Sequence, residues 1–99
     1  MTNEEKVKKI APWIDPEERV TVHFLDARDL NAEITGCNYE LVDLSIETHV
    51  PHMRQHISVP LSRIDISEDL SHYTRDPERP LKHRRLMLVI DDKRPPVIY

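Results

Sequence analysis

Glycine and cysteine are almost missing from this sequence of 99 residues, which has one of each, and aromatic residues are few. The single cysteine, Cys37, excludes a disulfide within the chain. No stretch resembles a secretion signal, and none is an apolar run of about 18 residues, the length that spans a bilayer. We therefore expect a soluble, cytoplasmic protein with no membrane partner.

Positive charge is also scarce over most of the chain, whose net charge is −4. Residues 1–70 hold seven Lys and Arg against fourteen Asp and Glu, a balance of −7, whereas residues 71–99 hold seven against four, or +3. Proteins that grip duplex DNA draw much of their affinity from phosphate contacts and usually carry a strongly basic surface. The charge pattern therefore argues against DNA as a partner.

The first residues have the composition of a short helix, which we expect over residues 3–11. Thr2 or Asn3 is a candidate N-cap, two glutamates follow in the first turn, and Pro12 ends the regular pattern. The length of the chain suits one domain with a single core. We place this domain at residues 1–94 and a C-terminal tail at residues 95–99.

Alternating apolar and polar residues predict strands within residues 19–66, and a continuous apolar run predicts a buried strand within residues 84–91. Gly36 predicts a bend or a bulge, because it is the residue that relieves backbone strain there. Pro60 indicates an edge position, because proline cannot donate to a central ladder.

A short helix followed by about five short strands, with no helical crossover between them, predicts a mainly β fold. The expected architecture is a small, strongly bent antiparallel barrel. Sharply bent strands normally use several glycines, and this chain has one. A closed barrel and a wider, open sheet therefore both remain as alternatives.

Residues 20–46 resemble the first motif of the Sm and Sm-like proteins, two hydrophobic strands with glycines at their bends and an Asp and an Asn in the following loop. Gly36 keeps a glycine of that motif, and apolar residues take its hydrophobic positions: Val20, Val22, Phe24, Leu30, Ile34, Leu41 and Leu44. The resemblance implies an Sm-like barrel, assembly through strand edges, and RNA as a ligand. The same strand pattern would suit SH3-like barrels with no nucleic-acid role.

The residues that would read RNA depart from this motif. Asn38 replaces the loop Asp, Glu40 replaces the residue that stacks on a base, and Val42 replaces the Asn that reads it. In the second motif, Pro60 and Leu61 stand where the family has Arg and Gly. A carboxylate repels phosphate and valine cannot hydrogen-bond a base edge, so the resemblance supports the barrel and not the uridine pocket.

Three histidines, His49, His52 and His56, follow one another at spacings of three and four. On a helix they would share one face and offer imidazoles to a transition metal. Pro51 disfavours a helix here, and Arg54 adds positive charge. We keep these histidines as a candidate metal site, with a solvated polar loop as the alternative, and expect no resident cofactor.

A basic run at residues 75–86 would suit phosphates or an acidic partner. Tyr73 is its only nearby aromatic residue, so the run lacks the stacking platform that is typical of single-strand binding. The alternative is an exposed loop and strand edge whose charges discourage aggregation. Combined with a polar turn, the run gives our candidate contacts with RNA or a protein partner: Asn38, Tyr39, Arg75, Arg79, Lys82, Arg84 and Arg85.

Motifs for catalysis are missing from the sequence, which has no glycine-rich phosphate loop, nucleophile elbow or Cys-x-x-Cys pair. Cys37 falls at a hydrophobic position of the strand pattern, where a thiol usually serves as inert packing. We predict a non-catalytic binding or assembly module that acts through protein–protein contacts, in a homo-oligomer or with a protein partner. RNA binding is the alternative, and metal binding by the histidine loop is a further one.

Overall fold

The computed structural model describes residues 1–15, 18–27, 29–73 and 82–98, and for residues 68–73 and 82–85 it describes the backbone alone. One short helix precedes a set of strands, with single 3-10 turns at two junctions. In chain order the elements are α1 (Asn3–Ile10), η1 (Ala11–Trp13), β1 (Val20–His23), β2 (Leu30–Cys37), β3 (Leu41–Glu47), β4 (Arg54–Pro60), η2 (Leu61–Arg63), β5 (Ile64–Tyr73) and β6 (Lys82–Ile90).

Helix α1 begins at a cap that the sequence predicted. The hydroxyl of Thr2 accepts a hydrogen bond from the backbone N–H of Glu5 at 3.2 Å. Glutamates in the first turn and lysines in the last turn complement the helix dipole. The helix ends at Ile10, whose fully buried side chain joins the core, and the 3-10 turn η1 follows directly. The predicted N-terminal helix is therefore confirmed, one residue shorter than expected.

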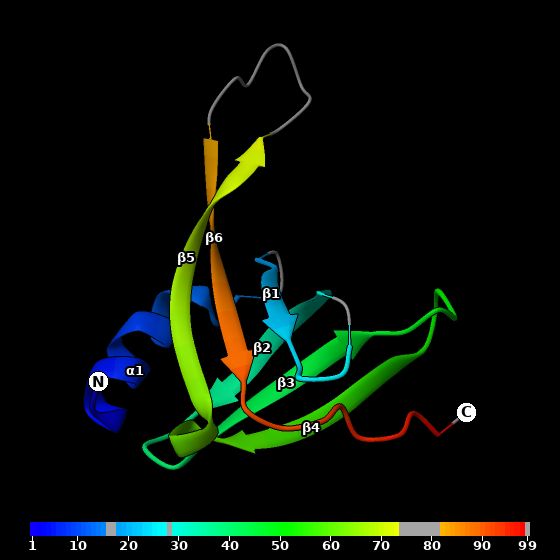
Figure 1. Cartoon of the computed structure of the whole chain (residues 1–99), viewed down its shortest axis with the longest axis horizontal. Helices are drawn as coiled ribbons and strands as arrows, with labels where there is room; N and C mark the ends of the chain where they lie inside the picture. Colours follow the sequence, from blue (N-terminus) through cyan, green and yellow to red (C-terminus); the bar gives the residue numbers. More distant parts are fainter. Residues whose placement is uncertain (16–17, 28, 74–81, 99) are drawn as a thin grey trace.

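The strands form one sheet in the order β4-β3-β2-β1-β6-β5. Figure 1 shows this sheet curling strongly into a half-barrel, with α1 beside it. Neighbouring strands are antiparallel except β1 and β6, which run parallel with Val22 opposite Leu88. The predicted fold class, a small and strongly bent β structure with a short N-terminal helix, is confirmed.

The sheet differs from the prediction in its details. The described chain contains six strands instead of about five, with the 3-10 turn η2 separating β4 from β5. β5 continues to Tyr73 and β6 starts at Lys82, so both extend beyond the expected strand ranges of 19–66 and 84–91. The sheet is open, since β4 and β5 are its two end strands. Local alternation does not reveal the parallel β1–β6 pair, because the two strands lie far apart in the sequence.

The predicted irregularity at the only glycine is confirmed. The β2–β3 register shifts between Ile34 and Gly36, so β2 carries a bulge there. Gly36 does not adopt a positive φ. The bulge therefore does not depend on a left-handed backbone, and the expected relief of backbone strain by glycine is not needed there.

The core fills the inner side of the curled sheet. The run at the end of β6 is buried at alternate positions, and β6 is central because it pairs with both β1 and β5. Pro60 lies on the end strand β4, which agrees with the predicted edge position. The buried apolar residues are Ile10, Val20, Val22, Phe24, Ala32, Ile34, Val42, Leu44, Ile46, Val59, Leu61, Ile64, Leu86, Leu88 and Ile90.

Candidate interaction site

The turn that joins β2 to β3 holds the first two candidate contact residues. The side-chain oxygen of Asn38 accepts hydrogen bonds from the backbone N–H groups of Glu40 and Leu41, both at 2.8 Å. Asn38 therefore builds the turn, as asparagine commonly does. The side chain of Tyr39 is 66% exposed, and its backbone oxygen accepts a hydrogen bond from Asn3 at 3.0 Å. Of these two candidate residues, Tyr39 is the one whose exposed side chain does not build the turn.

The basic run lies mostly beyond the side chains that the structure describes. Arg75 and Arg79 fall outside the described residues. Lys82, Arg84 and Arg85 are described only as backbone positions of β6. The run therefore stays a predicted contact.

The three candidate metal ligands are exposed and do not share a helix. His49 and His52 lie in the turn between β3 and β4, and His56 lies on β4. The turn is closed by a hydrogen bond from the N–H of Met53 to the oxygen of Val50 at 3.0 Å. Among the described residues, no group of three or more His, Cys, Asp or Glu side chains is placed to hold a metal ion.

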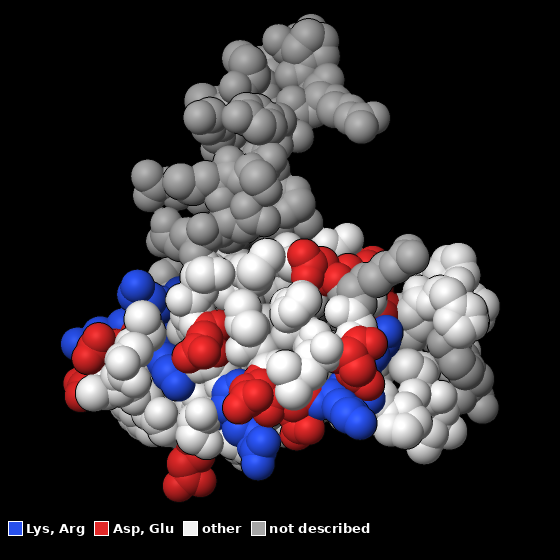
Figure 2. Space-filling model, in the orientation of Figure 1, with Lys and Arg blue, Asp and Glu red and all other residues white. Residues whose placement is uncertain are grey.

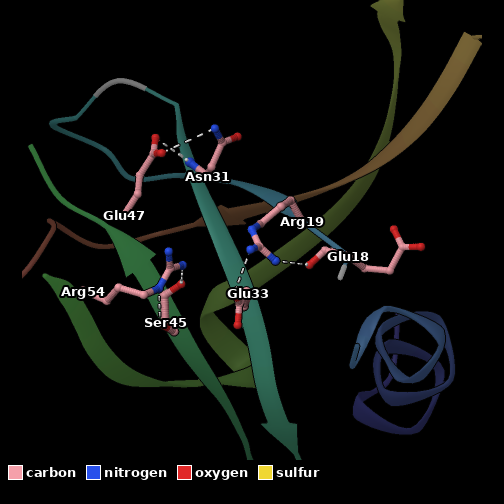
Figure 3. A network of polar contacts seen from close by, with 7 residues as sticks. All are labelled: Glu18, Arg19, Asn31, Glu33, Ser45, Glu47 and Arg54. Carbon is pink, nitrogen blue, oxygen red and sulfur yellow. Dashed lines mark hydrogen bonds and ion pairs between the residues drawn. The ribbon is translucent and has the colours of Figure 1, made fainter. Parts of the chain in front are cut away.

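The outer face of the sheet carries a network of polar contacts across β2, β3 and β4, drawn in Figure 3. Arg19 forms an ion pair with Glu33 at 2.9 Å. Arg54 donates to the hydroxyl and the backbone oxygen of Ser45, both at 2.6 Å. Figure 2 shows positive and negative side chains interspersed over the visible face. Such mixed charge favours solubility more than the binding of a polyanion.

The chain after β6 makes a set of contacts that the sequence did not predict. The backbone N–H of Arg94 donates to the Asp26 carboxylate at 3.0 Å. Its guanidinium donates to the side-chain oxygen of Gln55 at 2.9 Å and to the backbone oxygen of Glu47 at 3.1 Å. The side-chain nitrogen of Gln55 in turn donates to the backbone oxygen of Pro95 at 2.8 Å. Both ends of the Gln55 amide are therefore used to hold the C-terminal segment.

A groove of about 390 Å³ lies between this segment and β4. Residues of both faces of β4 line it, with Gln55 buried and His56 exposed, so the groove follows the outer edge of the strand. In the described chain, no backbone–backbone hydrogen bond joins residues 94–98 to β4. The full lining is Thr48, Met53, Arg54, Gln55, His56, Ile57, Pro95, Pro96, Val97 and Ile98.

The only cysteine is partly buried at the end of β2. Burial raises the pKa of the Cys37 thiol, and the negative charge of Asp43 raises this pKa further. A raised pKa keeps the thiol protonated near neutral pH, which lowers its reactivity as a nucleophile. This environment agrees with a packing role for Cys37.

Comparison with known proteins adds no relative: no family model, curated protein or solved structure matches this chain. The Sm-like resemblance therefore stays a prediction. At the motif positions that depart from the Sm pattern, Val42 and Leu61 are fully buried in the core. None of the described helices has the length and apolar character needed to cross a bilayer.

Proposed function

We propose that this chain is a non-catalytic binding or assembly module that acts through protein–protein contacts at the outer edge of β4. Its partner is another protein or a further copy of the chain, and its proposed location is the cytoplasm. The observation that carries this proposal is the position of β4, which ends the sheet and has no strand beyond it in the described part of the chain. An open edge presents unpaired N–H and C=O groups, to which an extended segment can add as a new strand.

The sequence of β4 supports this edge as a docking strand. Natural proteins protect open edges with lysines, prolines, bulges or inward charges. On β4 an arginine stands at the first position and a proline at the last, and residues 55–59 between them contain no lysine, carboxylate or proline. The register from Arg54 to Pro60 against β3 is regular, without a bulge. In its own sequence and register, the middle of β4 therefore lacks these devices against strand pairing, and the segment at residues 95–98 lies beside it without pairing as a strand.

Selection from a displayed library of random extended peptides tests the proposal, with the intact chain as target and Ile57→Lys as the edge variant. Ile57 lines the β4 groove, and a lysine placed there would put a charge on the edge. The control is Ile14→Lys, at a position 41% exposed and outside that groove. Circular dichroism checks that both variants fold. We expect ligands that bind the wild type and the control but not the edge variant; ligands indifferent to Ile57→Lys, or no ligands, would contradict the proposal.

RNA binding is the second candidate, and the exposed ring of Tyr39 favours it because bases stack on aromatic side chains. A labelled oligonucleotide titrated at several salt concentrations tests it. An RNA reader loses affinity steeply as salt rises, and Tyr39→Ala would weaken it. Our protein-binding proposal expects no salt-dependent binding and no effect of Tyr39→Ala.

A further inference from the structure

The C-terminal segment at residues 94–98 shows which groups the surface beside β4 holds. An arginine opens the segment, two prolines follow, and Val97 and Ile98 end it. Residues 95–98 line the groove together with β4, and Arg94 directly precedes them and contacts the groove residue Gln55. It is held mainly by the Arg94 side chain and the Gln55 amide.

We propose that this groove takes an extended segment of a partner protein in which an arginine precedes apolar residues, and that residues 94–98 are an internal stand-in for that segment. The inference rests on the proposed function, because it names the kind of partner that the β4 edge would bind. When such a partner docks, the stand-in leaves the groove. The segment therefore acts as a built-in competitor.

The arginine position is defined by two acceptors that a planar guanidinium can reach at once. Nε of Arg94 donates to the side-chain oxygen of Gln55, and a terminal nitrogen donates to the backbone oxygen of Glu47. These donors leave the guanidinium in fixed directions, whereas a lysine ammonium is a single point charge on a flexible stem. The Asp26 carboxylate, which holds the Arg94 N–H, adds negative charge nearby. These two acceptors therefore make the arginine position selective for arginine over lysine.

The remainder of the segment is a poor fit to the strand edge. Pro95 and Pro96 have no N–H groups, so they cannot donate to a ladder with β4. Ile98 is 90% exposed, and the groove of about 390 Å³ remains between the segment and the strand. A partner with N–H groups and apolar side chains after its arginine would pair with β4 and fill this space. Such a partner would make more hydrogen bonds and apolar contacts at this site than residues 94–98 make.

Fluorescence anisotropy with a labelled peptide of the sequence Arg-Pro-Pro-Val-Ile-Tyr tests this inference on the full chain. The intramolecular segment competes at an effective concentration near the millimolar range, so wild-type protein should bind the peptide weakly. Arg94→Ala should loosen the internal segment and tighten peptide binding about tenfold or more. Adding Gln55→Ala to that variant should reverse the gain. Equal affinities of the wild type and Arg94→Ala would overturn the inference.

A change in the peptide provides a test that does not depend on how the variants fold. Replacing the peptide arginine by lysine should weaken binding to the wild type and to Arg94→Ala by about tenfold, because the flexible ammonium lacks the planar, fixed donor geometry that matches both acceptors. Equal binding of the two peptides would overturn the selectivity. If the library ligands need the β4 edge but contain no arginine, the proposed function stands and this inference is overturned. If no ligand depends on the β4 edge, both are overturned. If the wild type is a dimer and Arg94→Ala converts it to a monomer, the groove binds the tail of a second copy of the chain. That result would overturn the inference that the partner is a different protein.

Discussion

The ammonium group of Lys6 donates a hydrogen bond to the backbone oxygen of Leu61 at 2.7 Å, and this contact joins α1 to the 3-10 turn between β4 and β5. Lys6 is only 7% exposed, and the side chain of Leu61 is fully buried. A charge-assisted hydrogen bond at a buried site is stronger than an exposed one. The contact fixes the helix over one end of the core.

Replacing this lysine tests the contribution of the contact. Lys6→Met keeps the apolar stem but leaves the Leu61 oxygen without its donor, so we expect the free energy of unfolding to fall by about 1 to 3 kcal/mol. Urea unfolding followed by circular dichroism measures this change. The matched control is Lys8→Met, on the same helix with a side chain 76% exposed, which should change the free energy by less than about 0.5 kcal/mol. Equal effects of the two substitutions would show that the Lys6 contact contributes nothing.

A buried hydroxyl on β1 predicts a substitution that raises the free energy of unfolding instead of lowering it. Thr21 is 4% exposed, and within the described structure its hydroxyl has no hydrogen-bond partner. Burying an unpaired polar group costs free energy, so Thr21→Val should raise the free energy of unfolding by about 1 kcal/mol. The control is Thr35→Val, which removes a hydroxyl that donates to the Asp43 backbone oxygen at 3.3 Å and should not stabilise the chain. Destabilisation by Thr21→Val would contradict the assignment of an unpaired hydroxyl.

The raised pKa of the Cys37 thiol predicts how its alkylation rate and its contribution to stability change with pH. Its pKa is raised first by burial and then by Asp43, so alkylation by iodoacetamide should reach half its maximal rate at a higher pH in the folded chain than in urea. Asp43→Asn should lower that midpoint. Because the folded state favours the protonated thiol, this stabilising contribution is present below the unfolded pKa and is lost as the pH rises through the folded pKa. A folded midpoint at or below the unfolded one would refute this account.

The turn between β2 and β3 predicts separate roles for two adjacent residues. Asn38→Ala removes the acceptor of two backbone N–H groups and should lower the free energy of unfolding by about 1 to 2 kcal/mol. Tyr39→Ala removes an exposed ring and should change it by less than about 0.5 kcal/mol. Thermal unfolding of both variants measures the difference. A larger loss for Tyr39→Ala than for Asn38→Ala would mean that the ring, and not the asparagine, holds this turn.

Local chemistry was enough to predict the elements, while long-range contacts were not visible in the sequence. Capping residues located α1, and alternation located the strands around Val20 and Leu44, because both signals act over a few neighbours. The parallel pairing of β1 with β6 depends on segments far apart in the chain. The contacts of Arg94 have the same origin, since Asp26, Glu47 and Gln55 come together only after the sheet has formed. The predicted tail therefore carried no sign that it would lie beside β4.

The most direct test of the account is an NMR titration of the full chain with the strongest peptide from the library selection. Binding at the β4 edge predicts amide shifts concentrated at residues 53–57 and, as the internal segment leaves, at Arg94, Val97 and Ile98, the residues of that segment that have an N–H group. The turn at residues 38–41 should stay unchanged. Shifts confined to that turn, or no shifts at saturating peptide, would contradict the claim that β4 is the binding edge of this protein.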